Sequence, residues 1–438
     1  MRRILTILLA VGMLLSCSGC VYQSGSIETM LSPPKLTPEQ HDIYAALKKV
    51  EGDQIRPSAP RSGDRLSAFV VEDLDDEPTP EAFVFFEQKG KEAAAGIQMC
   101  VLDMEDNVWQ AKQTIPGAGN EVDKVVIVHS QQYNRKFVFV GYNVVNKGEK
   151  LLKRYKIENG IFTEMADQNY TALEVTDLDM DGDDEVLLIQ AGLYSKETRV
   201  QMWQYDDVSG FVMTDEIPME PNVSNYQIKI GKLYPDIPAL YVDGSRGVDL
   251  YGTEILYCID GKLENPLYRG AGDLGNSTIR NVSTPVTDLD GDQIYEIPNV
   301  RLFPGHENEE QSSQQYITDW YDFEEGKMIK RCSSYVNTAK GYIFKLPETW
   351  GDMISIRQEG DQEIQFFLFH GTIDDYYDTV LQIKVLKLSE LRTEGAGEGF
   401  TEVKRNGQTI YLARISPDIG SEMALTLDQV GENLILTQ

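Results

Sequence analysis

Short apolar runs separated by turn residues dominate the chain from about residue 66 to residue 332. Residues 82–86, 125–128, 137–140 and 186–189 are four such runs, rich in Val, Ile and Phe, a composition that favours β-strands. Helical periodicity is scarce in this region, so we predict a mainly β fold. Units of about 50 residues with about four strands each are the size of propeller blades. We therefore predict a propeller-like array of about five four-stranded units, placed at residues 66–118, 119–169, 170–220, 221–270 and 271–332.

The segments on either side of this array have different patterns. Residues 21–65 begin as a tether rich in Ser, Gly and Pro and end in a short helix, for which Thr37 is the expected N-cap. Residues 333–438 combine strand-like runs with a helical pattern near 425–435. We predict that this tail is a separate small α+β domain, since about 100 residues suffice for one core.

The first 20 residues have the pattern of an export signal. A basic start at Arg2 and Arg3 precedes an apolar run over residues 4–15, which is too short to cross a bilayer. Small residues and two cysteines, Cys17 and Cys20, follow that run. This arrangement resembles the lipobox of bacterial lipoproteins, which implies lipidation at Cys17 or Cys20 and a membrane anchor on the extracytoplasmic face. An ordinary cleaved signal with incidental cysteines is the alternative.

The charge of the chain limits its partners. Acidic residues number 70 against 40 basic ones, for a formal net charge of −30. A field of that sign repels phosphate backbones, so we expect no nucleic-acid partner. The same excess of carboxylates suits the capture of cations, although a solvated acidic surface explains most of it.

The remaining cysteines do not form a metal or redox motif. Cys100, Cys258 and Cys332 are far apart, without the close spacing of zinc or thioredoxin-like sites. Cys100 and Cys258 stand in strand-like runs, where a thiol packs as a small hydrophobic group. One disulfide between two of these three cysteines is the alternative.

Three acid-rich segments recur along the array, about two units apart, and we name them acidic loops 73–81, 177–185 and 288–296. Each reads Asp-Leu-Asp-x-acid, has Glu at its ninth place, and precedes an apolar run. The intervening units have residues 120–123 and 234–237 where such a loop is expected, without the acids. The recurrence supports a repeated β-unit.

Alternating acids in a tight turn are suited to calcium, which takes six to eight oxygen ligands. In loop 177–185, glycine at the sixth place eases the turn, and crowded carboxylates would repel one another strongly without a cation. The twelfth places hold Val84, Leu188 and Asn299, so these loops are not EF-hands. The expected ligands of loop 177–185 are Asp177, Asp179, Asp181, Asp183 (through its carbonyl) and Glu185.

Acidic loops of this form before a strand resemble the FG-GAP or VCBS repeats of integrin-like β-propellers, over roughly residues 66–332. The resemblance implies structural Ca²⁺ in loop 177–185 and also in loop 288–296, at Asp288, Asp290, Asp292, Ile294 (through its carbonyl) and Glu296. Loop 73–81 matches less well, because prolines are present and the glycine is missing; its candidate metal ligands are Asp73, Asp75, Glu77 and Glu81. Acidic hairpin turns without a metal are the alternative for all three loops.

Other motifs add no catalytic machinery. Residues 270–275 spell GxGxxG but lack the strand and helix that a dinucleotide site needs, and His306 with nearby glutamates suits a solvated polar loop. We find no GxSxG or HExxH spacing in the sequence. We therefore expect a calcium-stabilised binding or scaffold module for an envelope protein or glycan. The alternative is an extracytoplasmic enzyme that acts on glycans and carries structural calcium.

Overall fold

The computed structural model describes residues 36–75, 77–88, 96–144, 150–191, 197–270, 278–373, 378–417 and 419–437. Cys17, Cys20 and the tether lie outside these residues, as does most of the GxGxxG segment. No helix within the described ranges is long and apolar enough to cross a membrane.

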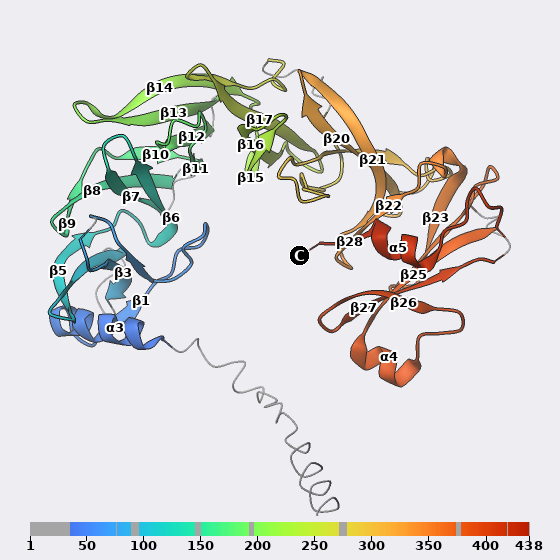
Figure 1. Cartoon of the computed structure of the whole chain (residues 1–438), viewed down its shortest axis with the longest axis horizontal. Helices are drawn as coiled ribbons and strands as arrows, with labels where there is room; N and C mark the ends of the chain where they lie inside the picture. Colours follow the sequence, from blue (N-terminus) through green and yellow to red (C-terminus); the bar gives the residue numbers. More distant parts are fainter. Residues whose placement is uncertain are drawn as a thin grey trace, which may run out of the picture.

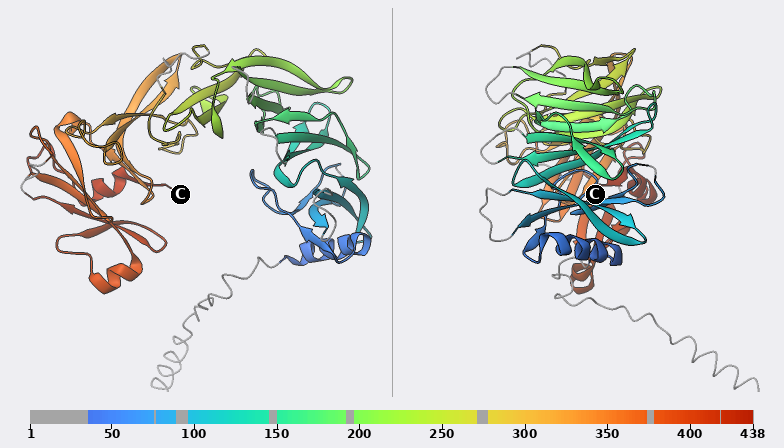
Figure 2. Two further views of the ribbon diagram at one scale, coloured as in Figure 1. Left: turned by 180° about the vertical axis from the view of Figure 1, so that it is seen from behind. Right: turned by 90° about the vertical axis from the view of Figure 1, so that its left-hand side faces the viewer.

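The prediction of a mainly β fold is confirmed. Six antiparallel sheets follow one another in chain order along an open arc, with sheet 1 and sheet 6 at its two ends (Figures 1 and 2). The arc is not closed into a ring in these views. The first four sheets fall within the first four predicted units with two exceptions. The short strand β1 joins sheet 1 from the preceding segment, and the last strand of sheet 2 ends at Tyr170, one residue beyond the predicted unit.

Sheets 1 to 3 have the following strands. Sheet 1 contains β1 (Ile55–Pro57), β2 (Phe69–Glu72), β3 (Glu81–Gln88), β4 (Gln98–Glu105) and β5 (Val108–Pro116). Sheet 2 contains β6 (Glu121–Ser130), β7 (Arg135–Asn143), β8 (Lys150–Glu158), β9 (Ile161–Glu164) and β10 (Gln168–Tyr170). Sheet 3 contains β11 (Ala172–Thr176), β12 (Glu185–Ala191), β13 (Thr198–Asp206) and β14 (Gly210–Met219).

Sheets 4 to 6 and the helices complete the chain. Sheet 4 contains β15 (Ser224–Leu233), β16 (Ile237–Ser245), β17 (Tyr251–Ile259) and β18 (Lys262–Glu264). Sheet 5 contains β19 (Ile297–Leu302), β20 (Tyr316–Glu324), β21 (Lys327–Asn337), β22 (Tyr342–Leu346) and β28 (Leu434–Leu436). Sheet 6 contains β23 (Ile354–Glu359), β24 (Glu363–Leu368), β25 (Thr379–Lys387), β26 (Thr401–Asn406) and β27 (Thr409–Ile415). The helical elements are α3 (Pro38–Glu51), η2 (Gly351–Met353), α4 (Leu388–Glu394) and α5 (Leu427–Asn433).

The core lies between the faces of neighbouring sheets. Phe83 of sheet 1 packs in one cluster with Val138 of sheet 2, and Leu187 of sheet 3 shares another with Leu240 of sheet 4. The middle strands are therefore buried on both faces, which explains why they are continuous apolar runs and do not alternate. Strand β3, for example, is buried from Glu81 to Phe86.

Helix α3 covers the face of sheet 1 that has no preceding sheet. Thr37 caps the helix and forms a capping box with Gln40, as the sequence predicts. Ile43 and Leu47 are fully buried against Val84 in one hydrophobic cluster. Burial of each such side chain stabilises the fold by about 1.5–3 kcal/mol. The helix thus protects the end of the array, as capping elements do in repeat proteins.

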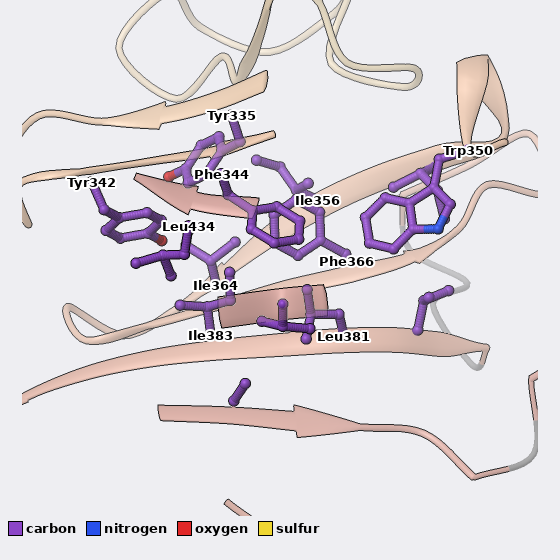
Figure 3. Close-up of a cluster of buried hydrophobic side chains, with 14 of the residues drawn as sticks. Tyr335, Tyr342, Phe344, Trp350, Ile356, Ile364, Phe366, Leu381, Ile383 and Leu434 are labelled. Carbon is purple, nitrogen blue, oxygen red and sulfur yellow. The ribbon is translucent and has the colours of Figure 1, made fainter. Parts of the chain in front are cut away.

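Sheets 5 and 6 share one hydrophobic core. Phe344 and Tyr335 of sheet 5 pack with Phe366 and Leu381 of sheet 6 (Figure 3). The boundary predicted between residues 332 and 333 falls inside β21, and β22 and β28 also join the fifth sheet. The tail therefore divides between two sheets, because the apolar face of β21 and β22 is covered by sheet 6. The predicted closing helix is present as α5.

Candidate metal centres

The three acidic loops occupy the same place in sheets 1, 3 and 5. Loop 73–81 joins β2 to β3, and loop 177–185 joins β11 to β12. Loop 288–296 leads into β19 from a short bridge between Thr287 and Glu296. In all three loops the residue before the loop pairs antiparallel with the glutamate at its ninth place, and the chain continues directly into β3, β12 or β19. The loops therefore lie at corresponding corners of repeated β-units.

The equivalent connections in sheets 2 and 4 are short turns. Residues 234–236 join β15 to β16, in the place that the sequence predicts. The prediction for sheet 2 is wrong, because residues 121–123 belong to strand β6 and the equivalent turn is 131–134. Asp123 is instead buried, where its carboxylate accepts a hydrogen bond from Tyr170 and pairs with Lys150.

The glutamate at the ninth place closes each loop through the backbone. Its carboxylate accepts a hydrogen bond from the backbone N–H of the leucine at the second place, at 2.7–2.8 Å in all three loops. That leucine is buried in the core each time. The recurring Asp-Leu and Glu therefore define one loop geometry, with the leucine as its anchor; the pairs are Leu74 with Glu81, Leu178 with Glu185, and Leu289 with Glu296.

Carboxylates converge in every loop. In loop 177–185, one oxygen each from Asp177, Asp179 and Glu185 lie within 4.8 Å of one another. The same criterion groups Asp73, Asp75 and Glu81 in the first loop, and Asp288, Asp290 and Asp292 in the third. Glu77, Asp181, Asp183, Ile294 and Glu296 are predicted ligands that fall outside these groups.

The side chains of two of those residues, Asp183 and Ile294, are engaged or buried elsewhere. The side chain of Asp183 points to sheet 2, where it accepts hydrogen bonds from the hydroxyl of Ser130 at 2.8 Å and the backbone N–H of Gln132 at 2.9 Å. The side chain of Ile294 is buried, with only 8% exposed. Both residues were predicted to bind through the carbonyl, so these side-chain positions are compatible with that role.

Loops 177–185 and 288–296 share three hydrogen bonds from backbone N–H groups to aspartate side chains. In each loop, the aspartate at the first place accepts a hydrogen bond from the backbone N–H at the sixth place. The aspartate at the third place accepts from the N–H at the fifth, and the aspartate at the fifth place accepts from the N–H at the seventh. Both also have positive φ at the fourth and sixth places. Met180 and Gly182 hold these places in one loop, whereas Gly291 and Gln293 hold them in the other. The glycine stands at the sixth place in one loop and at the fourth place in the other, although the backbone conformation at these places is the same.

The electrostatics of loop 177–185 fit a bound cation. Asp177 Oδ1 is buried and has no hydrogen-bond partner in the described structure. Burial, with Asp181 and Asp177 close by, raises the pKa of Asp179. Burial also raises the pKa of Glu185 to about 7. A divalent cation would neutralise this charge and give the unpartnered oxygen a ligand to bind.

The other two loops share part of this signature. Burial raises the pKa of Glu81 and of Glu296 to about 7 in each case. In loop 288–296, however, the converging Asp290 and Asp292 are exposed, so solvent screens their repulsion.

Neighbouring strands supply residues that the motif did not reveal. Gln204 of β13 donates to Glu185 Oε1 at 2.9 Å and holds the carboxylate in the loop. Ser130 and Gln132 come from the neighbouring sheet. Their spacing from residue 183 carries no sequence signal, because the contact depends on how two sheets pack.

Comparison with known proteins gives distant likenesses only. No family model and no curated protein matches the chain. Among solved structures, the chain is similar to the rhamnogalacturonan lyase YesW, with 12% identity and a TM-score of 0.32 over 82% of this chain and 91% of that chain. It is also similar to the Bacillus licheniformis rhamnogalacturonan lyase PL11, with 11% identity and a TM-score of 0.33 over 86% and 93%.

A third likeness is to the Pseudomonas aeruginosa periplasmic gluconolactonase PpgL. It has 13% identity and a TM-score of 0.29, over 74% of this chain and 86% of that chain.

Proposed function

We propose that this protein is a non-catalytic binding or scaffold module in which calcium stabilises the array of β-sheets. The observation that carries the proposal is the buried, unpartnered Asp177 Oδ1, which lies in a group of converging carboxylates with Asp179 and Glu185. Such an oxygen costs about 1–3 kcal/mol if it is left unsatisfied. A cation coordinated there removes that cost and the repulsion among the three carboxylates.

The bound ion would act on the junction between two sheets. Loop 177–185 docks on the β6–β7 turn through Asp183 and through a hydrogen bond from the N–H of Asp184 to the carbonyl of His129. An ion that orders the loop therefore orders the contact of sheet 3 with sheet 2. Because it binds only the folded loop, it stabilises the protein by mass action.

The proposed location follows from the first 20 residues. Lipidation at Cys17 or Cys20 would hold the module at the membrane on its extracytoplasmic face, where an envelope protein or a glycan is the proposed partner. Labelling of cells with a fatty-acid analogue tests the anchor. One of the two single variants, Cys17→Ala or Cys20→Ala, should lose the label. Retention of the label in both single variants and in the double variant would reject lipidation.

A glycan-acting enzyme is the alternative, and it requires two carboxylates that converge on a substrate cavity. A cavity of about 470 Å³ has three carboxylates in its lining, those of Asp123, Glu174 and the exposed Asp64. The two that are not exposed are each engaged by a lysine, Asp123 by Lys150 at 2.9 Å and Glu174 by Lys124 at 2.8 Å. Carboxylates held in ion pairs are poorly suited to proton transfer and attack, so this cavity favours the binding role.

Thermal unfolding with and without calcium tests the proposal. We expect calcium to raise the melting temperature of the purified protein, and magnesium at equal concentration to do less. The double substitution Asp179→Ala with Asp181→Ala should remove most of the calcium effect. Glu348→Ala with Asp361→Ala is the matched control, because both acids are exposed, lie outside the loops, and change the net charge equally. A parent protein that calcium does not stabilise would reject the proposal.

A further inference from the structure

A cavity of about 620 Å³ lies between sheet 4 and sheet 5, away from the acidic loops. Its walls come from separate parts of the chain: Asp249 in the β16–β17 turn, residues 281–284, residues 311–316, and strands β20 and β21. The volume is within the range of roughly 300–1,000 Å³ that is usual for small-molecule sites.

The lining of this cavity is polar but nearly uncharged. Nine of its twelve residues carry an amide or a hydroxyl group, and the others are two valines and Asp249, which is exposed. No Lys or Arg is among them. In a chain with 25% charged residues, this composition sets the cavity apart from the rest of the surface.

Two threonines in the wall, buried as residues, have hydroxyl groups that face the cavity. Thr318 of β20 is 2% exposed and Thr284 is 5% exposed, and both line the cavity. Neither hydroxyl oxygen is among the fully buried, unpartnered atoms of the described structure, and neither hydroxyl bonds to a described residue. Both are therefore accessible from the cavity, where they can bind water or a ligand.

A hydrogen-bond chain orients other groups at the same wall. Asn281 Nδ2 donates to the hydroxyl of Tyr316 at 3.0 Å, and that hydroxyl donates to Gln314 Oε1 at 2.7 Å. Gln314 Nε2 in turn donates to the backbone carbonyl of Glu309 at 3.3 Å. The chain fixes the amide of Asn281 and leaves its carbonyl oxygen available to accept a hydrogen bond from a ligand.

We infer that this cavity binds a neutral saccharide. An anionic ligand would meet no cationic side chain in the lining, and a cation would meet only the exposed carboxylate of Asp249. An apolar ligand would leave the amides and hydroxyls unsatisfied. Sugar hydroxyls both donate and accept, which matches the mixture of amide and hydroxyl groups, while the rings of Tyr316 and Tyr335 offer apolar surface. The inference rests on the binding role proposed above and names its ligand class.

The test measures saccharide binding to the purified full-length protein by calorimetry. The probes are neutral gluco-, manno-, xylo- and galacto-oligosaccharides, with oligogalacturonate as the anionic and chitosan oligomers as the cationic comparison. We expect binding to at least one neutral series. Thr318→Val and Asn281→Ala should each weaken it by about two- to tenfold, as the loss of one hydrogen bond predicts.

The control variant is Thr163→Val, at an exposed position of β9 that lies outside the cavity, and it should bind as the parent does. Thr318→Val conserves shape, and Asn281 is exposed, so at least one of the two variants should keep the fold. No binding to any neutral probe at millimolar concentration would overturn the inference. Equal binding by parent, Thr318→Val and Asn281→Ala, or binding to a charged probe only, would also overturn it.

Calcium-dependent melting of the same samples separates this inference from the proposed function. Retained calcium stabilisation without saccharide binding rejects the saccharide site alone. Saccharide binding without a calcium effect rejects the metal centres and leaves the cavity assignment intact.

Discussion

Acidic loops 177–185 and 288–296 share three backbone hydrogen bonds but have different surroundings. In the first, the converging carboxylates are half-buried or buried, and Asp177 Oδ1 has no partner in the described structure. In the second, two of the three converging aspartates, Asp290 and Asp292, are exposed. The loop motif thus produces the same local turn twice, and the packing around it decides how much charge is removed from water.

The neighbouring sheets contribute to the difference in exposure, whereas the difference in partners arises inside the loops, where Asp288 Oδ1 accepts from the N–H of Gly291. Loop 177–185 is held on sheet 2 by the side chains of both Asp183 and Asp184. Loop 288–296 meets sheet 4 through the carbonyl of Gln293, which accepts from the N–H of Lys232, and through the ring of Tyr295 on Tyr241. We therefore expect loop 177–185 to bind calcium more tightly than loop 288–296.

The largest effect should come from the leucine anchor. Leu178 is fully buried between sheets 3 and 4, so Leu178→Ala should cost about 2–5 kcal/mol of unfolding free energy. Leu289→Ala, at a residue that is 7% exposed, should cost less. Urea denaturation measures both, with the exposed Met180→Ala as the control. A cost under about 1 kcal/mol at Leu178 would contradict an anchoring role.

A smaller effect should follow from loss of the contact with sheet 2. Asp183→Ala leaves the buried hydroxyl of Ser130 and the N–H of Gln132 without their acceptor, at a cost of about 1–3 kcal/mol. A double-mutant cycle with Ser130→Ala measures the coupling between the two side chains. Additive costs would show that the two residues do not stabilise the junction together.

The calcium effect should depend on pH in loop 177–185. Burial raises the pKa of Glu185 from 4.5 to about 7, so the folded state binds this proton more tightly than the unfolded state does. Without calcium, this group therefore costs the protein stability as pH rises from 4.5 to 7. Calcium needs the ionised carboxylate, so its apparent affinity should be about tenfold weaker at pH 6 than at pH 8.

Melting curves at both pH values, with calcium and with a chelator, measure this dependence. The calcium shift should be larger at pH 8, whereas the chelated protein should lose stability over the range from pH 4.5 to 7. A calcium shift that is equal at pH 6 and pH 8 would mean that Glu185 does not bind the ion.

The smallest loss of unfolding free energy should come from the glycines, which stand at different places in the two loops. Gly291 has φ +83° and open space around its Cβ position, so Gly291→Ala should cost about 1 kcal/mol through backbone strain alone. Gly182→Ala, at φ +95°, should cost slightly more, because the new Cβ would lie 2.9 Å from Gln131 Oε1. Chemical denaturation measures both losses of unfolding free energy. The control is Gly326→Asn, in an open turn at φ +78°, and it should be neutral. Costs near zero would show that the two loops do not need left-handed backbone at these places.

Much of the fold was predictable because it depends on local signals. The runs of Val, Ile and Phe marked the strands, Thr37 and Gln40 marked the start of α3, and the repeated Asp-Leu-Asp marked corresponding corners of three sheets. The second sheet was misassigned at residues 121–123, because the polar start of a strand and a polar loop look alike in sequence.

The sequence by itself determined the strands and the acidic turns, because turn geometry and β propensity are properties of neighbouring residues. Only the tertiary structure decided how deeply each group of carboxylates is buried, that residues on both sides of position 332 share a sheet, and that Asp249, Asn281 and Thr318 meet at one cavity. These depend on which faces of separate sheets pack together. Packing of that kind is determined by complementary shape over the whole arc and leaves no periodic trace along the chain.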